Sequence, residues 1–177
     1  MRLSLCYNKA IKTLLRQPIQ GGSLMEKILG TDIVTQIGLI VRDIETTAKD
    51  YAEFLGQPVP PINPTGTYDK ALTQYYGKPT EARAKLAFFH VNQNLDIELI
   101  EPDEKDSIWR EFLEKRGEGV QHIAFNIRGM KETTAKLVDA GFPLTQKAEY
   151  VGGRYAYFNT FDKLKVDIEL LENDSDL

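Results

Sequence analysis

The sequence predicts an α+β protein in which two tandem βαβββ modules form a curved mixed sheet around a metal cleft. Two repeated phrases lead to this prediction. DIELIE at residues 96–101 returns as DIELLE at residues 167–172, and ETTAK at residues 45–49 returns unchanged at residues 132–136. Self-similarity of this kind indicates a duplicated supersecondary unit. Two such units can pair their sheets around a pseudo-twofold axis and leave a cleft between them.

Composition limits the class of protein before any motif is considered. A chain of 177 residues, 42% of them hydrophobic, is typical of one globular domain or two small packed modules. The net charge of -4 disfavours nucleic acid as a partner, and the single cysteine, Cys6, excludes a disulfide framework. No apolar run approaches the roughly 20 residues that span a bilayer. We therefore expect a cytoplasmic protein with no membrane partner.

The chain divides into four segments. The first 24 residues carry four basic side chains and no acidic one, and Gly21-Gly22-Ser23 is typical of a linker. A loose or helical extension is the favoured interpretation of this stretch, and a cleavable targeting segment is the alternative. The predicted boundaries are an N-terminal extension at 1–30, a first module at 31–102, a linker helix at 103–118, and a second module with an acidic tail at 119–177.

The first module begins with a β-branched, apolar strand at residues 32–41. A helix is predicted over residues 44–55, because apolar side chains recur there at helical spacing. Asp43 is suited to cap its start and Gly56 to end it. After a long loop, residues 85–91 and 95–100 are predicted to form a hairpin.

The loop at residues 57–83 is the longest irregular segment that the sequence predicts. Four prolines, at positions 58, 60, 61 and 64, forbid a central strand or helix at its start. Residues 65–83 are polar and rich in tyrosine, with room for one helical turn. Loops of this length in compact domains are often functional lids.

The second module repeats the order of the first. In the linker, Ser107 is suited to cap a short helix that Gly117 ends, with Trp109 as a packing anchor. The predicted elements that follow are a strand at 120–127, a helix at 131–140, and strands at 143–150, 154–160 and 165–171.

Four side chains occupy positions that the repeat makes equivalent. Gln36 and His122 lie at matching places on the first strand of each module, and Glu98 and Glu169 on the last. Taken singly, each has an ordinary structural role as the more frequent explanation. Related by a twofold axis, they meet in one cleft. Two carboxylates, an amide oxygen and an imidazole suit Zn, Co, Ni, Mn or Mg, with open positions for substrate.

Two segments resemble a known superfamily. IELIEP at residues 97–102 and FLEKRGEGVQHIAFNI at 112–127 are similar to the vicinal-oxygen-chelate (glyoxalase, bleomycin-resistance and dioxygenase) superfamily, and the likeness covers roughly residues 33–172. The residues of these two segments are most similar to those of methylmalonyl-CoA epimerase and glyoxalase I-like proteins. The resemblance implies paired βαβββ modules with a divalent metal. Its metal positions are Gln36, Glu98, His122 and Glu169.

The chain departs from the epimerase pattern in three places. Gln36 stands where epimerases have histidine, and Gln121-His122 stands where they have a pair of histidines. The strand that holds Lys85 lacks the second catalytic glutamate of epimerases. The set of Gln, Glu, His and Glu instead resembles that of animal glyoxalase I.

The resemblance implies a metal-dependent isomerase or lyase that abstracts a proton next to a carbonyl through a metal-stabilised enediolate. Glu169 would be both ligand and base, with Glu98 as its symmetry mate. Lys85 and Arg154 are candidates to bind a carboxylate or phosphate of the substrate, expected to be an acyl-CoA or a glutathione or thiol adduct.

The first expectation is a methylmalonyl-CoA epimerase-like enzyme, and a homodimer is expected. The alternatives are a lactoylglutathione lyase (glyoxalase I)-like enzyme and a non-catalytic, bleomycin-resistance-like binder of small molecules. A dioxygenase is disfavoured, because its iron site needs two histidines and only His122 stands at a ligand position.

Overall fold

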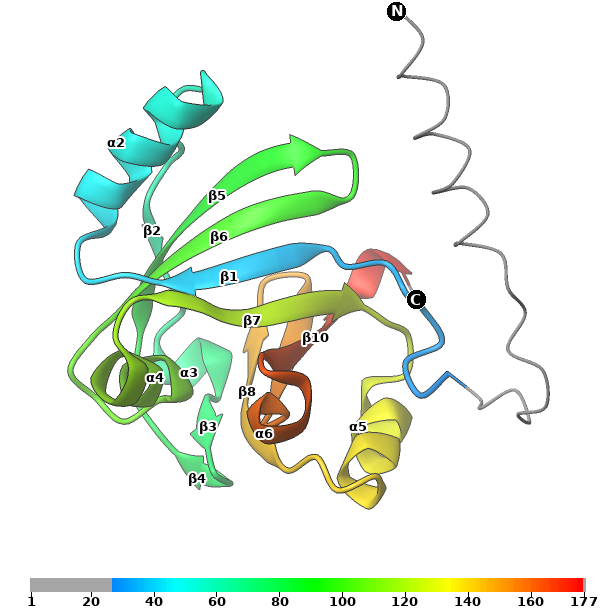
Figure 1. Ribbon diagram of the computed structural model, residues 1–177. Coiled ribbons are helices and arrows are strands. Elements are labelled where there is room, and N and C mark those ends of the chain that lie inside the picture. The colour runs from blue at the N-terminus through cyan, green and yellow to red at the C-terminus, as the bar shows by residue number, and fades with distance from the viewer. Residues whose placement is uncertain (1–26, 177) are drawn as a thin grey trace, which may run out of the picture.

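The ten strands of the structure form one sheet that curls into a half-barrel (Figure 1). The computed structural model describes residues 27–176, so the predicted extension at 1–30 lies outside the described residues up to residue 26. The strands are β1 (Gln36–Ile40), β2 (Asn63–Pro64), β3 (Gln74–Tyr75), β4 (Lys78–Pro79), β5 (Ala84–Asn92), β6 (Leu95–Pro102), β7 (Gly119–Asn126), β8 (Leu144–Tyr150), β9 (Gly153–Phe158) and β10 (Asp167–Asn173). The helices are α2 (Ile44–Leu55), α3 (Tyr68–Ala71), α4 (Ile108–Arg116), α5 (Met130–Asp139) and α6 (Phe161–Leu164), with a 3₁₀ turn at Asp174–Asp176.

The strand order confirms the predicted mixed sheet. It runs β2-β5-β6-β1-β7-β10-β9-β8-β3-β4. β1 is parallel to β6 and β7 is parallel to β10, while β1 and β7 pair antiparallel at the centre. The first strand of each module therefore lies beside its own last strand and beside its counterpart. This arrangement is the pseudo-twofold that the repeated phrases predict.

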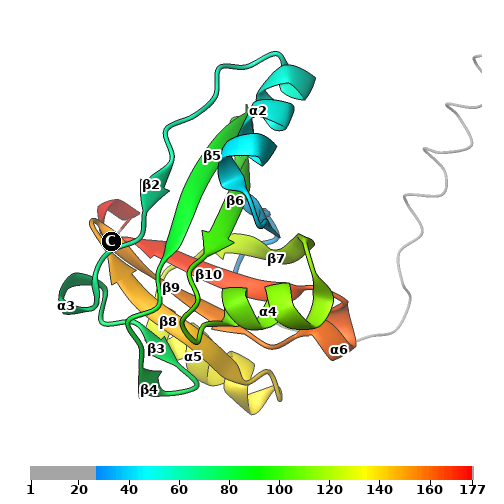
Figure 2. The ribbon, with the colours of Figure 1, turned by 90° about the vertical axis from the view of Figure 1, so that its left-hand side faces the viewer.

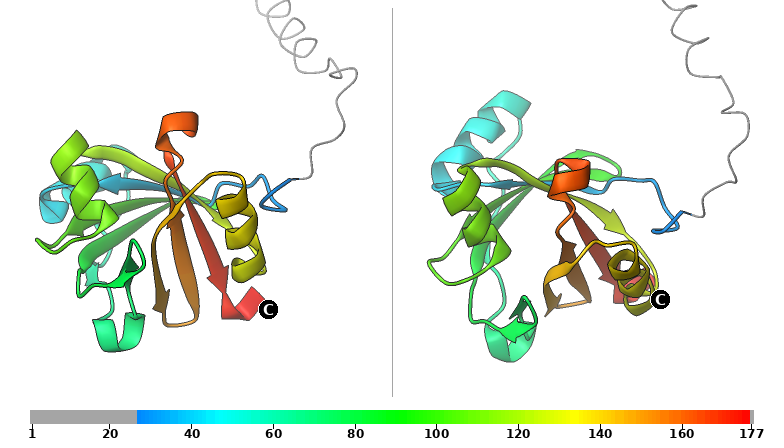
Figure 3. Two further views of the ribbon diagram at one scale, coloured as in Figure 1. Left: turned by 90° about the horizontal axis from the view of Figure 1, so that it is seen from below. Right: turned by 60° about the horizontal axis from the view of Figure 1, so that its bottom comes forward.

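Helices α2 and α5 pack on the outer face of the sheet, and α4 packs on its inner face. Ala48 of α2 lies over Phe89 and Leu99, and Leu137 of α5 lies over Phe158 and Leu170. Figure 3 shows α2 and α4 on one side of the molecule and α5 on the other. The inner cluster joins Trp109 of α4 to residues from both modules, among them Ile40, Ile100 and Tyr157. The end of the half-barrel nearest α4 is therefore filled.

Local signals place the helices. The Asp43 side chain accepts a hydrogen bond from the Thr46 amide at 3.0 Å, and Gly56 closes α2 in the left-handed conformation with φ of 65°. The Ser107 side chain accepts one from the Arg110 amide at 3.1 Å at the start of α4. The predicted bounds of α2 are confirmed. The strand predicted at 32–41 is shorter, spanning only β1.

The segment predicted as a long loop at 57–83 contributes strands to both edges of the sheet. β2 pairs with β5 at one edge, and β3 pairs with β8 at the other. Figure 2 shows this segment descending from α2 through β2 to α3, β3 and β4. Residues 65–73 alone join β2 to β3, so the two edges lie no farther apart than about 36 Å. The segment thus spans the open side of the half-barrel.

Hydrogen bonds fasten this inserted segment to the rest of the chain. The Tyr75 hydroxyl donates to Glu111 of α4 at 2.5 Å, and the Thr80 hydroxyl donates to the Asp106 carbonyl at 2.9 Å. Arg83 donates through Nε to the Thr65 carbonyl at 2.8 Å. The segment is therefore a fixed wall. Within residues 27–176, no helix has the length and apolar character needed to cross a membrane.

Candidate metal centre

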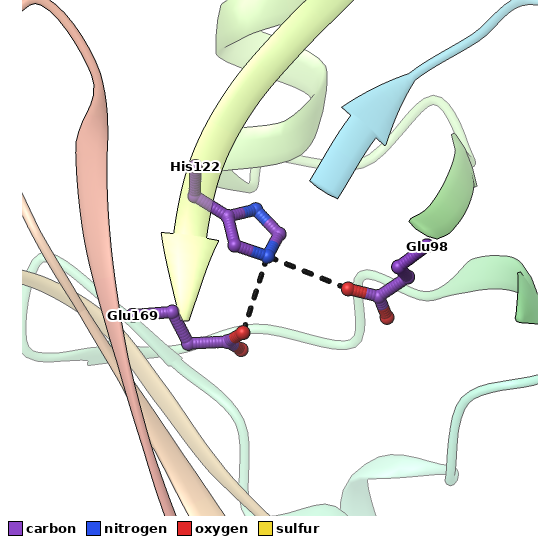
Figure 4. Close-up of side chains that lie close together, drawn as sticks. All are labelled: Glu98, His122 and Glu169. Carbon is purple, nitrogen blue, oxygen red and sulfur yellow. Dashed lines mark ion pairs between the residues drawn. The ribbon is translucent and has the colours of Figure 1, made fainter. Parts of the chain in front are cut away.

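One imidazole and two carboxylates converge at the middle of the sheet (Figure 4). His122 comes from β7, Glu98 from β6 and Glu169 from β10. His122 Nε2 lies 3.1 Å from Glu169 Oε2 and 3.4 Å from Glu98 Oε2. The exposed fractions are 0% for His122, 5% for Glu98 and 3% for Glu169. Both modules thus supply side chains to one buried cluster.

A glycine in β1 makes room for the imidazole. Gly38 lies in register with Glu98 on one side and with His122 on the other. A Cβ atom at position 38 would overlap the His122 ring. Glycine inside a strand often marks such a close approach. The ring therefore lies across β1 and reaches the carboxylate of the first module.

Two further side chains orient His122. Its Nδ1 donates to Gln121 Oε1 at 2.8 Å, and Gln121 Nε2 donates to Asp167 Oδ2 at 3.2 Å. A hydrogen bond at one ring nitrogen assigns the tautomer and leaves the other nitrogen as a lone-pair donor. The Nε2 lone pair of a neutral His122 is thereby directed at the two glutamates. Asp167, which the sequence left without a role, anchors this chain of contacts.

The charge of the cluster calls for a cation. Burial lowers the pKa of His122, but Glu169 and Glu98 outweigh it and raise that pKa to about 9. Burial also raises the pKa of Glu98. Glu98 Oε2, His122 Nε2 and Glu169 Oε2 have no partner with hydrogen-bond geometry. Buried polar atoms are normally satisfied, so three that face one point fit a divalent metal ion.

Gln36, the fourth predicted ligand, lines the same cleft as Glu98 and Glu169. It is in register with Ala124 of β7 and with Asp96 of β6. Its amide oxygen is a ligand type that hard divalent ions accept. The structure thus brings three predicted ligands into contact distance and places the fourth on the cleft wall beside them.

The two predicted substrate-binding cations lie elsewhere. Lys85 faces α2 on the outer side of β5, where its Nζ pairs with Glu45 at 3.2 Å and Glu101 at 2.9 Å. Arg154 pairs with Glu149 at 3.4 Å and with Glu172 and Asp174 at 2.7 Å each. Neither side chain is part of the cleft lining. The structure therefore does not bring Lys85 or Arg154 to the candidate centre.

The cleft has a volume of about 890 Å³ and opens beside the glutamates. Glu98 and Glu169 line it, whereas His122 lies behind them. Its aromatic wall includes Trp109, Tyr155 and Tyr157. The Tyr157 ring packs edge-on against His122 with centroids 5.0 Å apart. A ligand in the cleft would meet the carboxylates and these rings, and the imidazole would stay out of reach.

Sequence reasoning missed several members of the site. Gly38 carries a usable signal, since a glycine inside a β-branched strand suggests close packing. Gln121 and Asp167 were visible only as neighbours of predicted ligands. Trp109 was predicted to be a packing anchor, and it does pack in the inner cluster. Trp109 also lines the cleft, while its Nε1 is buried without a contact of full hydrogen-bond geometry in the described structure.

Comparisons with known proteins agree with this geometry. Residues 35–158 match the Glyoxalase/Bleomycin resistance protein/Dioxygenase superfamily. The uncharacterized protein YqjC of Bacillus subtilis is 32% identical over 99 residues, which are 54% of this chain and 70% of that protein.

Solved structures with a similar fold include methylmalonyl-CoA epimerases. The Mycobacterium tuberculosis enzyme is 22% identical with a TM-score of 0.55, over 85% of this chain and 93% of that one. A Streptomyces coelicolor variant in complex with 2-nitronate-propionyl-CoA is 21% identical with a TM-score of 0.54, over 80% and 96%. At these identities the likeness shows the fold. With the matched residues spanning most of the chain, the protein belongs to the Glyoxalase/Bleomycin resistance protein/Dioxygenase superfamily.

Proposed function

We propose that the protein is a metal-dependent isomerase or lyase that abstracts a proton next to a carbonyl. The reaction is methylmalonyl-CoA epimerase-like, in that a carbon acid next to a carbonyl loses and regains a proton. The supporting observation is the convergence of Glu98, His122 and Glu169, with both carboxylates on the wall of a cleft. This combination provides a cation site and a base within reach of one ligand.

Glu98, His122 and Glu169, with Gln36 beside them, would hold a divalent ion such as Zn, Co, Ni, Mn or Mg. When bound, such an ion supplies Lewis-acid stabilisation to a developing enolate oxygen. The residues contribute the rest. The hydrogen bond to Gln121 holds His122 in the tautomer whose Nε2 lone pair can bind a metal ion. Because His122 is fully buried, its ring would contact the ion and not the substrate.

Glu169 is the proposed base, with Glu98 as its symmetry mate. Glu169 takes the proton from the carbon next to the carbonyl. Delivery of a proton from Glu98 to the opposite face of the same carbon is epimerisation, and return of the proton by Glu169 to the neighbouring carbon is the lyase-type outcome. Burial raises the pKa of Tyr157 well above its usual range, so its phenol stays protonated beside the carboxylates. The cleft can therefore offer a hydroxyl donor next to the reacting atoms.

A lactoylglutathione lyase-like reaction is the second candidate. Gln36 in the cleft favours it, because the set of Gln, Glu, His and Glu resembles that of animal glyoxalase I. The two candidates share the first proton transfer and differ only in where the proton is returned. Both candidate reactions would use Glu169 as the base and the same cation site.

Deuterium exchange tests the proposal. Metal-loaded protein is incubated in D₂O with thioesters and hydroxycarbonyl compounds, and incorporation next to the carbonyl is followed by mass spectrometry. We expect exchange that Glu169→Gln lowers by about 100-fold or more, typical of losing a general base. Glu45→Gln, in the exposed acidic group around Lys85, serves as the control. Ligand binding without any exchange would leave the non-catalytic, bleomycin-resistance-like binder as the function.

A further inference from the structure

The cleft has a charge that does not suit a phosphate-bearing substrate. Among the described residues, its lining contains no lysine or arginine and four carboxylates: Asp96, Glu98, Glu149 and Glu169. A divalent ion would neutralise the two central glutamates. Asp96 pairs with His90 Nδ1 at 2.6 Å, and Glu149 pairs with Arg154. The described lining of the loaded cleft would then hold no free positive side chain to receive a phosphate.

Arg83, Arg154 and Lys85 are held by other groups. Arg83 donates to the Thr65 carbonyl, which belongs to the inserted wall. Arg154 lies behind Glu149 with two further carboxylate partners, so Glu149, and not the guanidinium, faces the cleft. Lys85 lies on the outer face of the sheet. Moving any of them to a ligand would break ion pairs or hydrogen bonds already made.

The rest of the lining suits uncharged polar groups. Side-chain amides gather at the rim, including Asn92 and Asn94 of the β5–β6 hairpin and Asn126 at the end of β7. Amides both donate and accept hydrogen bonds, as hydroxyl and carbonyl groups require. Deeper in the cleft, the indole of Trp109 is only 3% exposed and adds an uncharged aromatic surface to the wall.

We propose that the cleft selects an uncharged hydroxycarbonyl or small thioester compound and rejects substrates that carry phosphate groups, including CoA thioesters. The inference deepens the proposed function and rests on it only for the carbonyl group. Volume does not decide the matter, because 890 Å³ lies within the range of ordinary ligand pockets. The selection comes from charge, since the described lining offers a phosphate no lysine or arginine to offset its charge in a partly desolvated site.

Trp109 provides a direct readout of binding. It is the single tryptophan of the chain and lines the cleft, so its emission reports occupancy without turnover. Metal-loaded full-length protein is titrated with two matched pairs. One pair is S-propionyl-N-acetylcysteamine and propionyl-CoA, and the other is dihydroxyacetone and dihydroxyacetone phosphate. We expect the neutral member of each pair to bind about tenfold tighter or more, with a gap that narrows at high salt.

A charge-reversal variant links the selectivity to the rim. Asn94 is exposed at the hairpin, and Asn94→Lys would place an ammonium at the mouth of the cleft. We expect it to tighten binding of the phosphate-bearing members by about tenfold. Asn94→Gln keeps an amide and is the matched control. Equal or tighter binding of the charged members by the unmodified protein, no emission change with any probe, or an unchanged preference in Asn94→Lys would overturn the proposal.

The outcome is separable from that of the proposed function. If the protein prefers neutral ligands but catalyses no deuterium exchange, the charge selection is supported and the proposed enzymatic function is excluded. If the protein catalyses exchange but prefers propionyl-CoA, the proposed enzymatic function is supported and the proposed charge selection is excluded.

Discussion

The two modules share one fold but contribute unequally to the candidate centre. The second supplies His122, held through Gln121 by Asp167. The first supplies Gln36 at the equivalent position, and its matching aspartate, Asp96, pairs instead with His90, whose side chain is 80% exposed. The second module therefore holds its imidazole through an internal chain of hydrogen bonds, whereas side chains of both modules line the cleft.

The modules also differ at their outer strands. β8 of the second module has seven residues, whereas its counterpart β2 has two. The prolines at positions 58, 60, 61 and 64 explain the loss, because proline lacks the amide that a sheet needs. The inserted segment that follows supplies the missing wall. The repeat therefore preserves the candidate centre, and the inserted segment lines part of the cleft.

The largest asymmetry is expected at the paired positions Gly38 and Ala124. Gly38→Ala would push a methyl group into the His122 ring, so we expect metal affinity to fall by about 100-fold or more, as for a displaced ligand. Ala124→Gly, at the symmetry-related place, should cost only about 1 kcal/mol of stability and leave metal binding intact. Metal titration and thermal melts of both variants check this. Equal effects of the two changes would contradict the proposed packing.

The pH dependence of the metal-free protein is expected to be the next largest effect. The folded state raises the pKa of His122 from 6.5 to about 9. This stabilisation is therefore complete below pH 6.5 and is lost as the pH rises to about 9, on the order of 3 kcal/mol at most. The raised pKa of Glu98 acts with the same sign.

Denaturant melts of metal-free protein across this range measure the slope. His122→Gln should abolish most of it, because glutamine does not titrate, and saturating Zn²⁺ should remove it in the unmodified chain. Stability that rises with pH over the same window would show that the carboxylates do not hold a protonated imidazole.

A smaller difference is expected between the two equivalent aspartates. Asp167→Ala removes the acceptor that holds Gln121 and should weaken metal binding by about tenfold. Asp96→Ala removes a partner of exposed His90 and should change metal affinity by less than about twofold. Competition with a chromophoric chelator measures both. An equal loss for both aspartates would mean that the second module has no special orienting role.

The smallest effect concerns the inserted segment, which has no counterpart in the second module. Tyr75→Phe removes the 2.5 Å hydrogen bond to Glu111 and should lower stability by about 1 kcal/mol. Tyr76→Phe removes a longer, exposed contact of 3.3 Å to the same carboxylate and should cost less. Chemical denaturation compares them. If Tyr75→Phe also weakened metal binding, the wall would be coupled to the centre.

Much of the fold could be predicted because its signals are local or repeated. The bounds of α2 follow from Asp43 and Gly56, and the ligand positions follow from the duplicated phrases. β3 and β4 could not be predicted, since each has two residues, β3 depends on a distant partner, β8, and β4 pairs only with β3. The contact by which Gln121 orients His122 could not be predicted either. The pairing of β1 with β7 shifts register between Gly38 and Leu39, so Gln121 of β7 is skipped, and strand alternation does not predict the direction of its side chain.

The positions of Lys85 and Arg154 show where strand patterns fail. β5 is apolar on both faces, with Leu86 and Phe88 toward the cleft and Ala87 and Phe89 toward α2. When both faces are buried, alternation does not reveal which way a charged residue points. The same holds for β9, where Arg154 precedes the aromatic and apolar residues Tyr155, Ala156, Tyr157 and Phe158. Charged residues near a predicted site were therefore assigned to it by proximity in sequence.

Titration of metal-free full-length protein with Mn²⁺ by calorimetry tests the central claim, that both modules build one centre. The expected result is about one ion per chain, with affinity reduced by about 100-fold or more in Glu98→Gln of the first module and equally in Glu169→Gln of the second. Glu45→Gln should bind as the unmodified chain does. Two ions per chain, or full affinity in either Glu98→Gln or Glu169→Gln, would contradict a single centre shared by the two modules.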